Sequence, residues 1–175
     1  MQALTFWKTV TMDRSGLLEQ VVDRLTAAGI RFCVVGGQAV NAYVDPVVSL
    51  DLDLALAAGE VERVEALLGA EADYRIERFA HSLNLSAPGS DLRVQFQTDP
   101  RYEGFPERAA EREVLGLRLP VAALEDVLQG KVWAALDETR RGSKRQKDLA
   151  DVSRLLEAHP ELRSRVPQAL LDRLL

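Results

Sequence analysis

A short apolar segment that ends at two adjacent glycines limits what this 175-residue chain can become. The residues from Arg31 to Val35 are mostly β-branched or aromatic and are followed by Gly36-Gly37, as in a buried strand that ends at a tight turn. Apolar residues three and four apart from Gly16 to Ala28 predict a helix before this strand. Residues Gln38 to Tyr43 allow a brief helix after it. This order of elements favours an α/β fold.

A second predicted strand carries two acidic side chains. From Val47 to Leu56 the residues alternate, so that three leucines share one face and Asp51 and Asp53 share the other. Residues i and i+2 of a strand lie about 7 Å apart, which lets both carboxylates hold a hard cation such as Mg²⁺ with its phosphates. The alternatives are a solvated strand that carries acids by chance and, for Gly36-Gly37, an ordinary tight turn.

The rest of the chain reads as a small mixed sheet backed by helices, with a helical C-terminal segment. We therefore predict an α/β (α+β) core over residues 1–120 and a helical segment over 121–175 that packs on it. The further elements expected are a helix at 60–68, strands at 74–79, 82–86 and 91–97, a short strand ending near 119, a helix at 121–136 that Pro120 opens, and helices at 146–158 and from 160 to the C-terminus.

Composition excludes several classes of protein. The single cysteine, Cys33, rules out a disulfide framework and a zinc site built on several thiolates, and we read it as a small buried hydrophobe. A net charge of −5 argues against DNA sequence readout by the whole surface. The chain has no apolar run of membrane-spanning length and no secretory signal pattern, so we predict a cytoplasmic protein without membrane contact.

The segment from Val34 to Leu56, VVGGQAVNAYVDPVVSLDLDLAL, resembles the signature of the minimal nucleotidyltransferases of the DNA polymerase β superfamily, especially the AbiEii-like toxins. That signature is a strand, a Gly-Gly or Gly-Ser turn, a helix and an Asp-x-Asp strand. A later helix with Lys131 and a Lys-Asp-x-x-Asp helix at 147–151 extend the resemblance over most of residues 31–156.

The resemblance implies transfer of a nucleotidyl group from a nucleoside triphosphate (NTP), with Mg²⁺ or Mn²⁺ as cofactor. The roles it implies fall into three sets. Asp51 and Asp53 would be catalytic and metal-binding; Gly36, Gly37, Ser49, Lys131, Arg145 and Lys147 would bind the nucleotide; Gln95, Asp148 and Asp151 would lie on the site face.

A basic stretch, RRGSKRQK from Arg140 to Lys147, is expected in a loop that leads into a helix. Such a loop could clamp a triphosphate or an RNA acceptor backbone. The alternatives are a solvated surface loop and a plain ion pair between Lys147 and Asp151, which are four residues apart on a helix.

The sequence departs from the family pattern at the third carboxylate, which normally activates the incoming hydroxyl from a neighbouring strand. The matching place in this chain is Arg93 or Gln95, and neither can act as a base. We expect Asp91 to substitute as a catalytic residue; its alternative is a turn residue after Gly89-Ser90. His81 and His159 have no metal-ligand partners nearby in the sequence and are read as surface residues.

Three functions remain open. The first is an active nucleotidyltransferase that modifies RNA, a protein or a small molecule, as the toxin of a toxin–antitoxin pair. The second is a catalytically degenerate nucleotide-binding or regulatory module, because the third carboxylate is missing. The third is an antitoxin-like protein whose amphipathic tail binds a helical partner.

Overall fold

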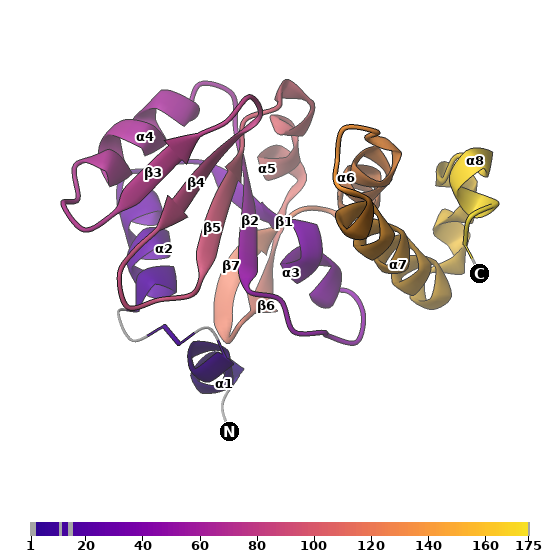
Figure 1. Ribbon diagram of the computed structural model, residues 1–175, viewed down its shortest axis with the longest axis horizontal. Coiled ribbons are helices and arrows are strands. Elements are labelled where there is room, and N and C mark those ends of the chain that lie inside the picture. The colour runs from indigo at the N-terminus through magenta and orange to yellow at the C-terminus, as the bar shows by residue number, and fades with distance from the viewer. Residues whose placement is uncertain (1–2, 11, 14–15, 175) are drawn as a thin grey trace.

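The computed structural model describes residues 3–10, 12–13 and 16–174, and its centre is one seven-stranded mixed sheet (Figure 1). The strand order is β3-β4-β5-β2-β1-β7-β6. Strand β2 runs parallel to β5 and antiparallel to β1, and β1 runs parallel to β7. The predicted fold class, a mixed sheet backed by helices, is confirmed.

The predicted elements follow one another along the chain in the expected order, and the structure adds further short elements. They are α1 (Ala3–Val10), α2 (Leu17–Ala27), β1 (Phe32–Val35), α3 (Gly36–Asn41), β2 (Asp51–Leu56), α4 (Val61–Gly69), β3 (Arg75–Arg78), β4 (Ser82–Ser86), β5 (Arg93–Gln97), the 3-10 helix η1 (Pro100–Tyr102), α5 (Phe105–Arg108), β6 (Ala110–Val114), β7 (Leu117–Val121), α6 (Leu124–Leu136), α7 (Gly142–Ala158), the 3-10 helix η2 (Pro160–Arg165) and α8 (Gln168–Leu171). The elements that the sequence analysis missed are helix α1, the 3-10 helix η1, helix α5 and strand β6.

The two faces of the sheet differ in chemistry around β2. Leu52 and Leu54 of β2 and Val94 and Phe96 of β5 are fully buried in a core that also contains the apolar residues of α2 and α4. The alternate residues, Asp53 among them, point to the opposite face, which Figure 1 shows open in front of β5 and β4. Because successive side chains of a strand point to opposite faces of the sheet, the polar residues lie where a ligand can reach them.

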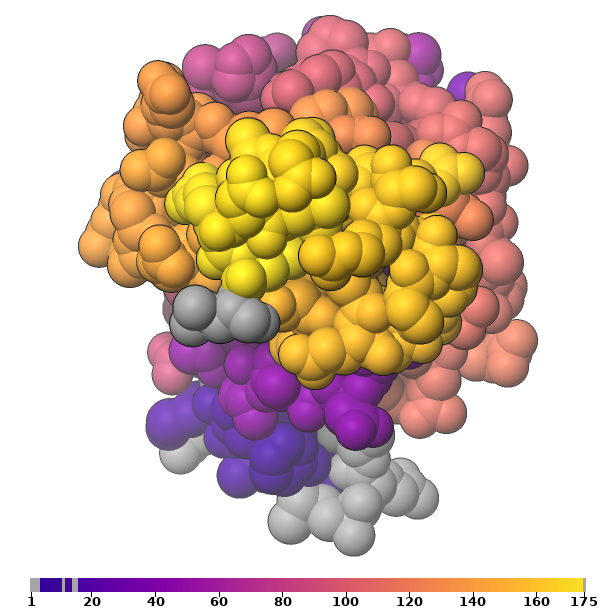
Figure 2. All heavy atoms as spheres, turned by 90° about the vertical axis from the view of Figure 1, so that its right-hand side faces the viewer, coloured from indigo at the N-terminus to yellow at the C-terminus, as the bar shows by residue number. Residues whose placement is uncertain are grey.

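Helices α6 and α7 stand beside this open face, and the C-terminal residues pack over their outer side, as Figure 2 shows. Arg154 of α7 fastens the pair to the rest of the protein. Its guanidinium donates to the Asn41 side chain at 3.0 Å and to the Asp45 carbonyl at 2.6 Å. Apolar residues of α6 and α7 belong to the same buried core as the sheet.

The second predicted strand begins later than expected, at Asp51 instead of Val47. The Asn41 side chain hydrogen-bonds both backbone groups of Val47, at 2.7 and 3.0 Å, and Gln38 donates to the Ser49 carbonyl at 3.1 Å. Side chains of α3 thus satisfy backbone groups that a strand would otherwise pair. Leu50, predicted on the core face, is 38% exposed in this loop.

The region around Pro120 is a hairpin and not the start of a helix. Strands β6 and β7 are joined by Leu115 and Gly116, both with positive φ, the conformation of a tight two-residue hairpin turn. Pro120 lies in β7, opposite Glu111, and α6 starts only at Leu124. The prediction failed because the turn carries a leucine where asparagine or glycine usually marks it.

Two helix boundaries also differ from the prediction. Helix α7 begins at Gly142, so most of the basic stretch forms its first two turns and not a loop. The C-terminal region is a 3-10 helix that begins at Pro160 and is followed by the short α8, because Pro167 interrupts the expected continuous helix. No helix in the described part of the chain combines the length and apolar character needed to cross a bilayer.

Candidate active site

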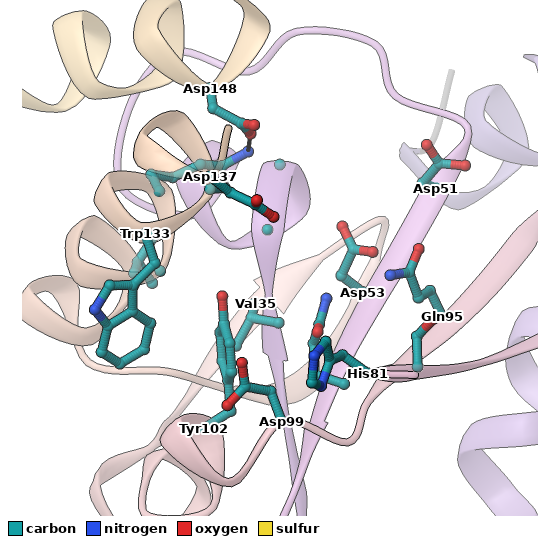
Figure 3. A pocket seen from close by; sticks show the side chains of 18 of the residues that line it. Val35, Asp51, Asp53, His81, Gln95, Asp99, Tyr102, Trp133, Asp137 and Asp148 are labelled. Carbon is teal, nitrogen blue, oxygen red and sulfur yellow. Dashed lines mark hydrogen bonds and ion pairs between the residues drawn. The ribbon is translucent and has the colours of Figure 1, made fainter. Parts of the chain in front are cut away.

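A cleft of about 270 Å³ opens where the polar face of the sheet meets α6 and α7 (Figure 3). The sheet contributes its polar side chains from β2 and β5, α3 contributes its first residues, and α6 and α7 contribute basic side chains from the other side. Of the predicted site residues, those that line the cleft are Gly36, Gly37, Ser49, Asp51, Asp53, Gln95, Lys131, Lys147 and Asp148.

Gly36 occupies a position that no other residue fits. Its φ is +67°, and a Cβ there would lie 2.9 Å from Cγ of Asp53 and still closer to the carboxylate oxygen. Gly37 has no such restriction, since a Cβ would meet only the Ser49 hydroxyl at 3.7 Å. The first glycine of the pair therefore exists to let the chain turn directly over the Asp53 carboxylate.

Asp51 and Asp53 lie on the same face of β2, as predicted, but in different electrostatic surroundings. Asp51 is ion-paired with Arg93, its direct neighbour in the β2–β5 register, at 2.8 Å. Burial raises the pKa of Asp53 to about 6, the nearby Lys131 opposes this, and the charge of Asp51 adds to it. The charged form of Asp53 is therefore under-compensated in the protein alone.

The neighbouring strand offers no third carboxylate beside Asp53. The residue opposite Asp53 in the parallel register is Gln95, and the residue opposite Asp51 is Arg93. Asp91 is exposed before the start of β5 and does not line the cleft. The acid that does line it from this segment is Asp99, two residues beyond Gln97.

The sequence analysis missed Asp99, although a signal for it existed. Residues 93, 95 and 97 share the polar face of β5, and continuing the same step of two beyond the end of the strand reaches Asp99. Arg101 holds its carboxylate with hydrogen bonds at 2.8 and 3.0 Å from the guanidinium and at 2.9 Å from the backbone.

Lys131 is buried on α6 and bridges two aspartates of α7, at 3.0 Å from Asp148 and 2.7 Å from Asp151. Arg140 completes the pairing of Asp148 at 2.7 Å, and Arg154 that of Asp151 at 2.8 Å. Burial alone would lower the pKa of the Lys131 amine, but the two carboxylates outweigh it and raise that pKa. The cluster locks α6 to α7.

The proposed surface ion pair between Lys147 and Asp151 does not form, because Asp151 is buried against α6 and paired there with Lys131 and Arg154. Lys147 instead lines the cleft with Lys144 and Arg140. Arg145 is half-buried and is not among the lining residues. The segment from Arg140 to Lys147 thus presents three basic side chains to the cleft, of which Arg140 is also paired with Asp148.

One wall of the cleft is aromatic, which the sequence analysis did not anticipate. Tyr102, Phe105 and Trp133 pack together, with the rings of Tyr102 and Trp133 5.3 Å apart, and the Arg101 guanidinium lies 4.7 Å from the Trp133 ring. His81, read as an ordinary surface residue, also points into the cleft in Figure 3. Arg101, Tyr102 and Phe105 lie within five residues of one another, but His81 and Trp133 come from distant segments, and no local pattern connects the three segments.

Comparison with known proteins agrees with this geometry. The family described as the nucleotidyl transferase AbiEii toxin of type IV toxin–antitoxin systems matches residues 20–174. The solved structure of the antibiotic-resistance factor ANT(2'')-Ia superposes with a TM-score of 0.57 at 17% identity, covering 90% of this chain and 94% of that one. The lincosamide antibiotic adenylyltransferase LnuA gives a TM-score of 0.52 at 13% identity, covering 79% and 95%. No curated protein matches by sequence.

Proposed function

This chain belongs to the AbiEii family of nucleotidyl transferases, and from that premise we propose that it moves a nucleotidyl group from an NTP to an acceptor with a divalent metal held by Asp51 and Asp53. The observation that carries the proposal is the pair of carboxylates on one face of β2 with Gly36 folded directly over Asp53. We also propose a division of labour between residues 1–120, which carry these carboxylates, and residues 121–175, which carry the facing cations.

The carboxylates fit Mg²⁺ or Mn²⁺ by their chemistry. Hard cations prefer oxygen ligands, and Mg²⁺ is commonly held by one or two carboxylates with substrate phosphates and water completing its shell. Burial raises the pKa of Asp53 despite the nearby Lys131, and a bound dication would offset that cost of its charged form. Within the described residues no cluster of three or more acidic, histidine or cysteine ligands exists, so the phosphates would complete the shell. When bound, the metal would stabilise charge on the transferring phosphate.

The triphosphate would lie between the glycine turn and the start of α7. Gly36 and Gly37 leave the backbone open to close approach, and Ser49 places a hydroxyl next to Gly37. Arg140, Lys144 and Lys147 of the cleft would neutralise the phosphate charge from the opposite side. Lys131, with its charge committed to two aspartates, would act mainly by fixing α6 against α7.

The chemical step would be attack of an acceptor hydroxyl on the α-phosphorus, with the bond to pyrophosphate breaking. The protein's part is to align the two reactants and to balance charge, which is how most phosphoryl- and nucleotidyl-transfer sites work. Ser82 of β4 and Gln95 and Gln97 of β5 line the cleft on the sheet side, and an acceptor would enter beside them.

We further propose that the protein is the toxin of a toxin–antitoxin pair, with a cognate antitoxin as partner, because that is the setting of its family. Its acceptor is an RNA, a protein or a small molecule. The named relatives in the fold comparison support the last class, since one is a lincosamide adenylyltransferase and another was solved with adenylyl-2''-tobramycin.

The second candidate is a nucleotide-binding module without transfer activity. The observation that favours it is Gln95 opposite Asp53, where a base would be expected in the superfamily. Binding of metal and nucleotide does not separate the two candidates, so transfer itself must be measured.

The first experiment measures the melting temperature with Mg²⁺ or Mn²⁺ and each of ATP, GTP, CTP and UTP. A ligand at 100 times its Kd stabilises by about 2.7 kcal/mol, or roughly 5–10 °C for a chain of this size. The shift should disappear in the Asp51→Asn/Asp53→Asn double variant and remain in Asp73→Asn, a matched change at an exposed aspartate. No metal-dependent shift with any nucleotide would overturn the proposal.

The second experiment offers the selected NTP, labelled at the α-phosphate, together with total bacterial RNA, soluble bacterial protein, or tobramycin and lincomycin. If the wild type incorporates label into one of these pools and the Asp53→Asn variant does not, the result demonstrates the activity and identifies the class of acceptor. A nucleotide-binding protein that labels none of them is the degenerate module.

A further inference from the structure

The cleft contains a histidine with no role in the function proposed so far. His81 ends the turn between β3 and β4 and lines the cleft beside Ser82 and Gln97. Its backbone is held in place, because Phe79 donates to the Ser82 carbonyl at 2.8 Å and Thr98 donates to the His81 carbonyl at 3.0 Å. Figure 3 shows the imidazole pointing into the cleft from the sheet side, where the acceptor would enter.

Nucleotidyl transfer to a hydroxyl is aided by a group that takes its proton, and the strand beside Asp53 provides none. Asp53 itself is assigned to the metal. Every other carboxylate that lines the cleft already has a partner. Asp51 pairs with Arg93, Asp99 with Arg101, Asp126 with Arg108, Asp137 with Thr139, and Asp148 with Lys131 and Arg140.

His81 differs from these carboxylates, because its imidazole makes no hydrogen bond or ion pair with any residue in the described part of the chain. An imidazole is also the side chain best suited to exchange a proton near neutral pH. Among the described residues that line the cleft, it is therefore the group most available to accept a proton.

We propose that His81 is the general base of the transfer reaction and takes over, from a different strand end, the role that a third carboxylate has in related enzymes. This assignment rests on the proposed function. The acceptor hydroxyl oxygen forms a bond to the α-phosphorus, the hydroxyl proton moves to a ring nitrogen of His81, and the bond to pyrophosphate breaks. The imidazolium then returns the proton to water.

Asp99 supports this role by its charge and position. It lines the same cleft, its side chain is only 13% exposed, and two guanidinium nitrogens of Arg101 donate to one of its carboxylate oxygens while the Arg101 backbone N–H donates to the other. Hydrogen bonds from Arg101 hold the pKa of Asp99 below its usual range, and the charge of His81 contributes in the same direction. Asp99 is therefore an ionised neighbour that stabilises the imidazolium formed in the step, while Arg101 limits that effect.

The test compares His81→Gln and His81→Ala with the wild type in single-turnover transfer of α-labelled NTP to whichever acceptor pool the wild type labels. His159→Gln is the matched control, because His159 is the other histidine of the chain and lies outside the cleft. We expect both His81 variants to lose about 10²–10⁴-fold in rate. The metal-dependent nucleotide shift in melting temperature should be unchanged, and added imidazole should restore part of the rate of His81→Ala.

Two results would overturn the assignment while leaving the proposed function intact. One is a transfer rate of the His81 variants within threefold of the wild type. The other is a loss of rate that parallels a loss of nucleotide binding and that imidazole does not rescue, which would show a binding role. A wild-type protein that binds no nucleotide or transfers to no acceptor would instead refute the proposed function, and this assignment with it.

Discussion

Replacing Gly36 with alanine tests whether the glycine turn and the Asp53 carboxylate form one unit. The added Cβ meets two penalties, since φ is +67° and the Asp53 side chain lies in its way. The left-handed backbone costs about 1–2 kcal/mol for an L-residue, and displacing a packed neighbour costs about 1–3 kcal/mol more. We expect Gly36→Ala to lower the free energy of unfolding by about 2–4 kcal/mol, and with it the melting temperature by roughly 5–15 °C.

Gly59 supplies a matched control within the same chain. Its φ is +78°, and a Cβ there would have no neighbour within 4 Å. Gly59→Ala should therefore lower the free energy of unfolding only by the cost of the left-handed backbone, about 1–2 kcal/mol. It should also keep the metal-dependent, nucleotide-induced shift in melting temperature, which Gly36→Ala should lose. Differential scanning fluorimetry and urea unfolding measure both quantities.

A double-variant cycle separates the contact with Asp53 from strain elsewhere. If the clash is the cause, Gly36→Ala should cost at least about 1 kcal/mol less in an Asp53→Gly background than in the wild type, because glycine removes both the carboxylate and the Cβ that obstruct the new methyl group. Equal losses for Gly36→Ala and Gly59→Ala, with nucleotide binding kept in both, would refute the reasoning.

Three further predictions concern the charges of the cleft. The pKa of Asp53 is raised to about 6, so its charge destabilises the metal-free protein progressively as pH rises from about 4 to above 6. In EDTA at pH 7.5, Asp53→Asn should therefore have a free energy of unfolding up to about 3 kcal/mol higher than that of the wild type. Below pH 4 this difference, measured by urea unfolding, should vanish. Lys131→Met leaves Asp148 and Asp151 buried without their shared cation and should cost about 3–5 kcal/mol in urea unfolding; a loss under 1 kcal/mol would contradict the locking role. Arg93→Gln frees Asp51 from a partly exposed ion pair. The Mg²⁺ concentration that gives half of the nucleotide-induced shift in melting temperature should therefore fall by about two- to fivefold. A higher Mg²⁺ concentration would mean that Arg93 assists binding.

Local patterns in the sequence were sufficient to place the two carboxylates. Side chains alternate along any strand, so Asp51 and Asp53 had to share a face once the strand was recognised, and Leu52 had to point into the core. The glycine pair at the end of the first strand marked the turn in the same way. The sequence did not distinguish Gly36, which the Asp53 contact requires, from Gly37, which has room for a methyl group.

The errors arose where a contact with another segment outweighs a local preference. Asn41 and Gln38 take the backbone hydrogen bonds of residues 47–49, which keeps that alternating segment out of the sheet. Pro120, a common helix-starting residue, lies in β7 because its strand pairs with β6 and runs parallel to β1. Neither choice can be predicted without knowing which segments meet.

The sequence by itself determined which side chains share a face, because that depends on a repeat of two or 3.6 residues within one element. Only the tertiary structure decided which faces meet across the cleft. Lys131 pairs with acids 17 and 20 positions away, His81 faces Asp99 from another turn, and Gln95 stands beside Asp53. These neighbours are set by strand register and helix packing, which depend on apolar burial summed over the whole core and leave no signature in any short stretch of sequence.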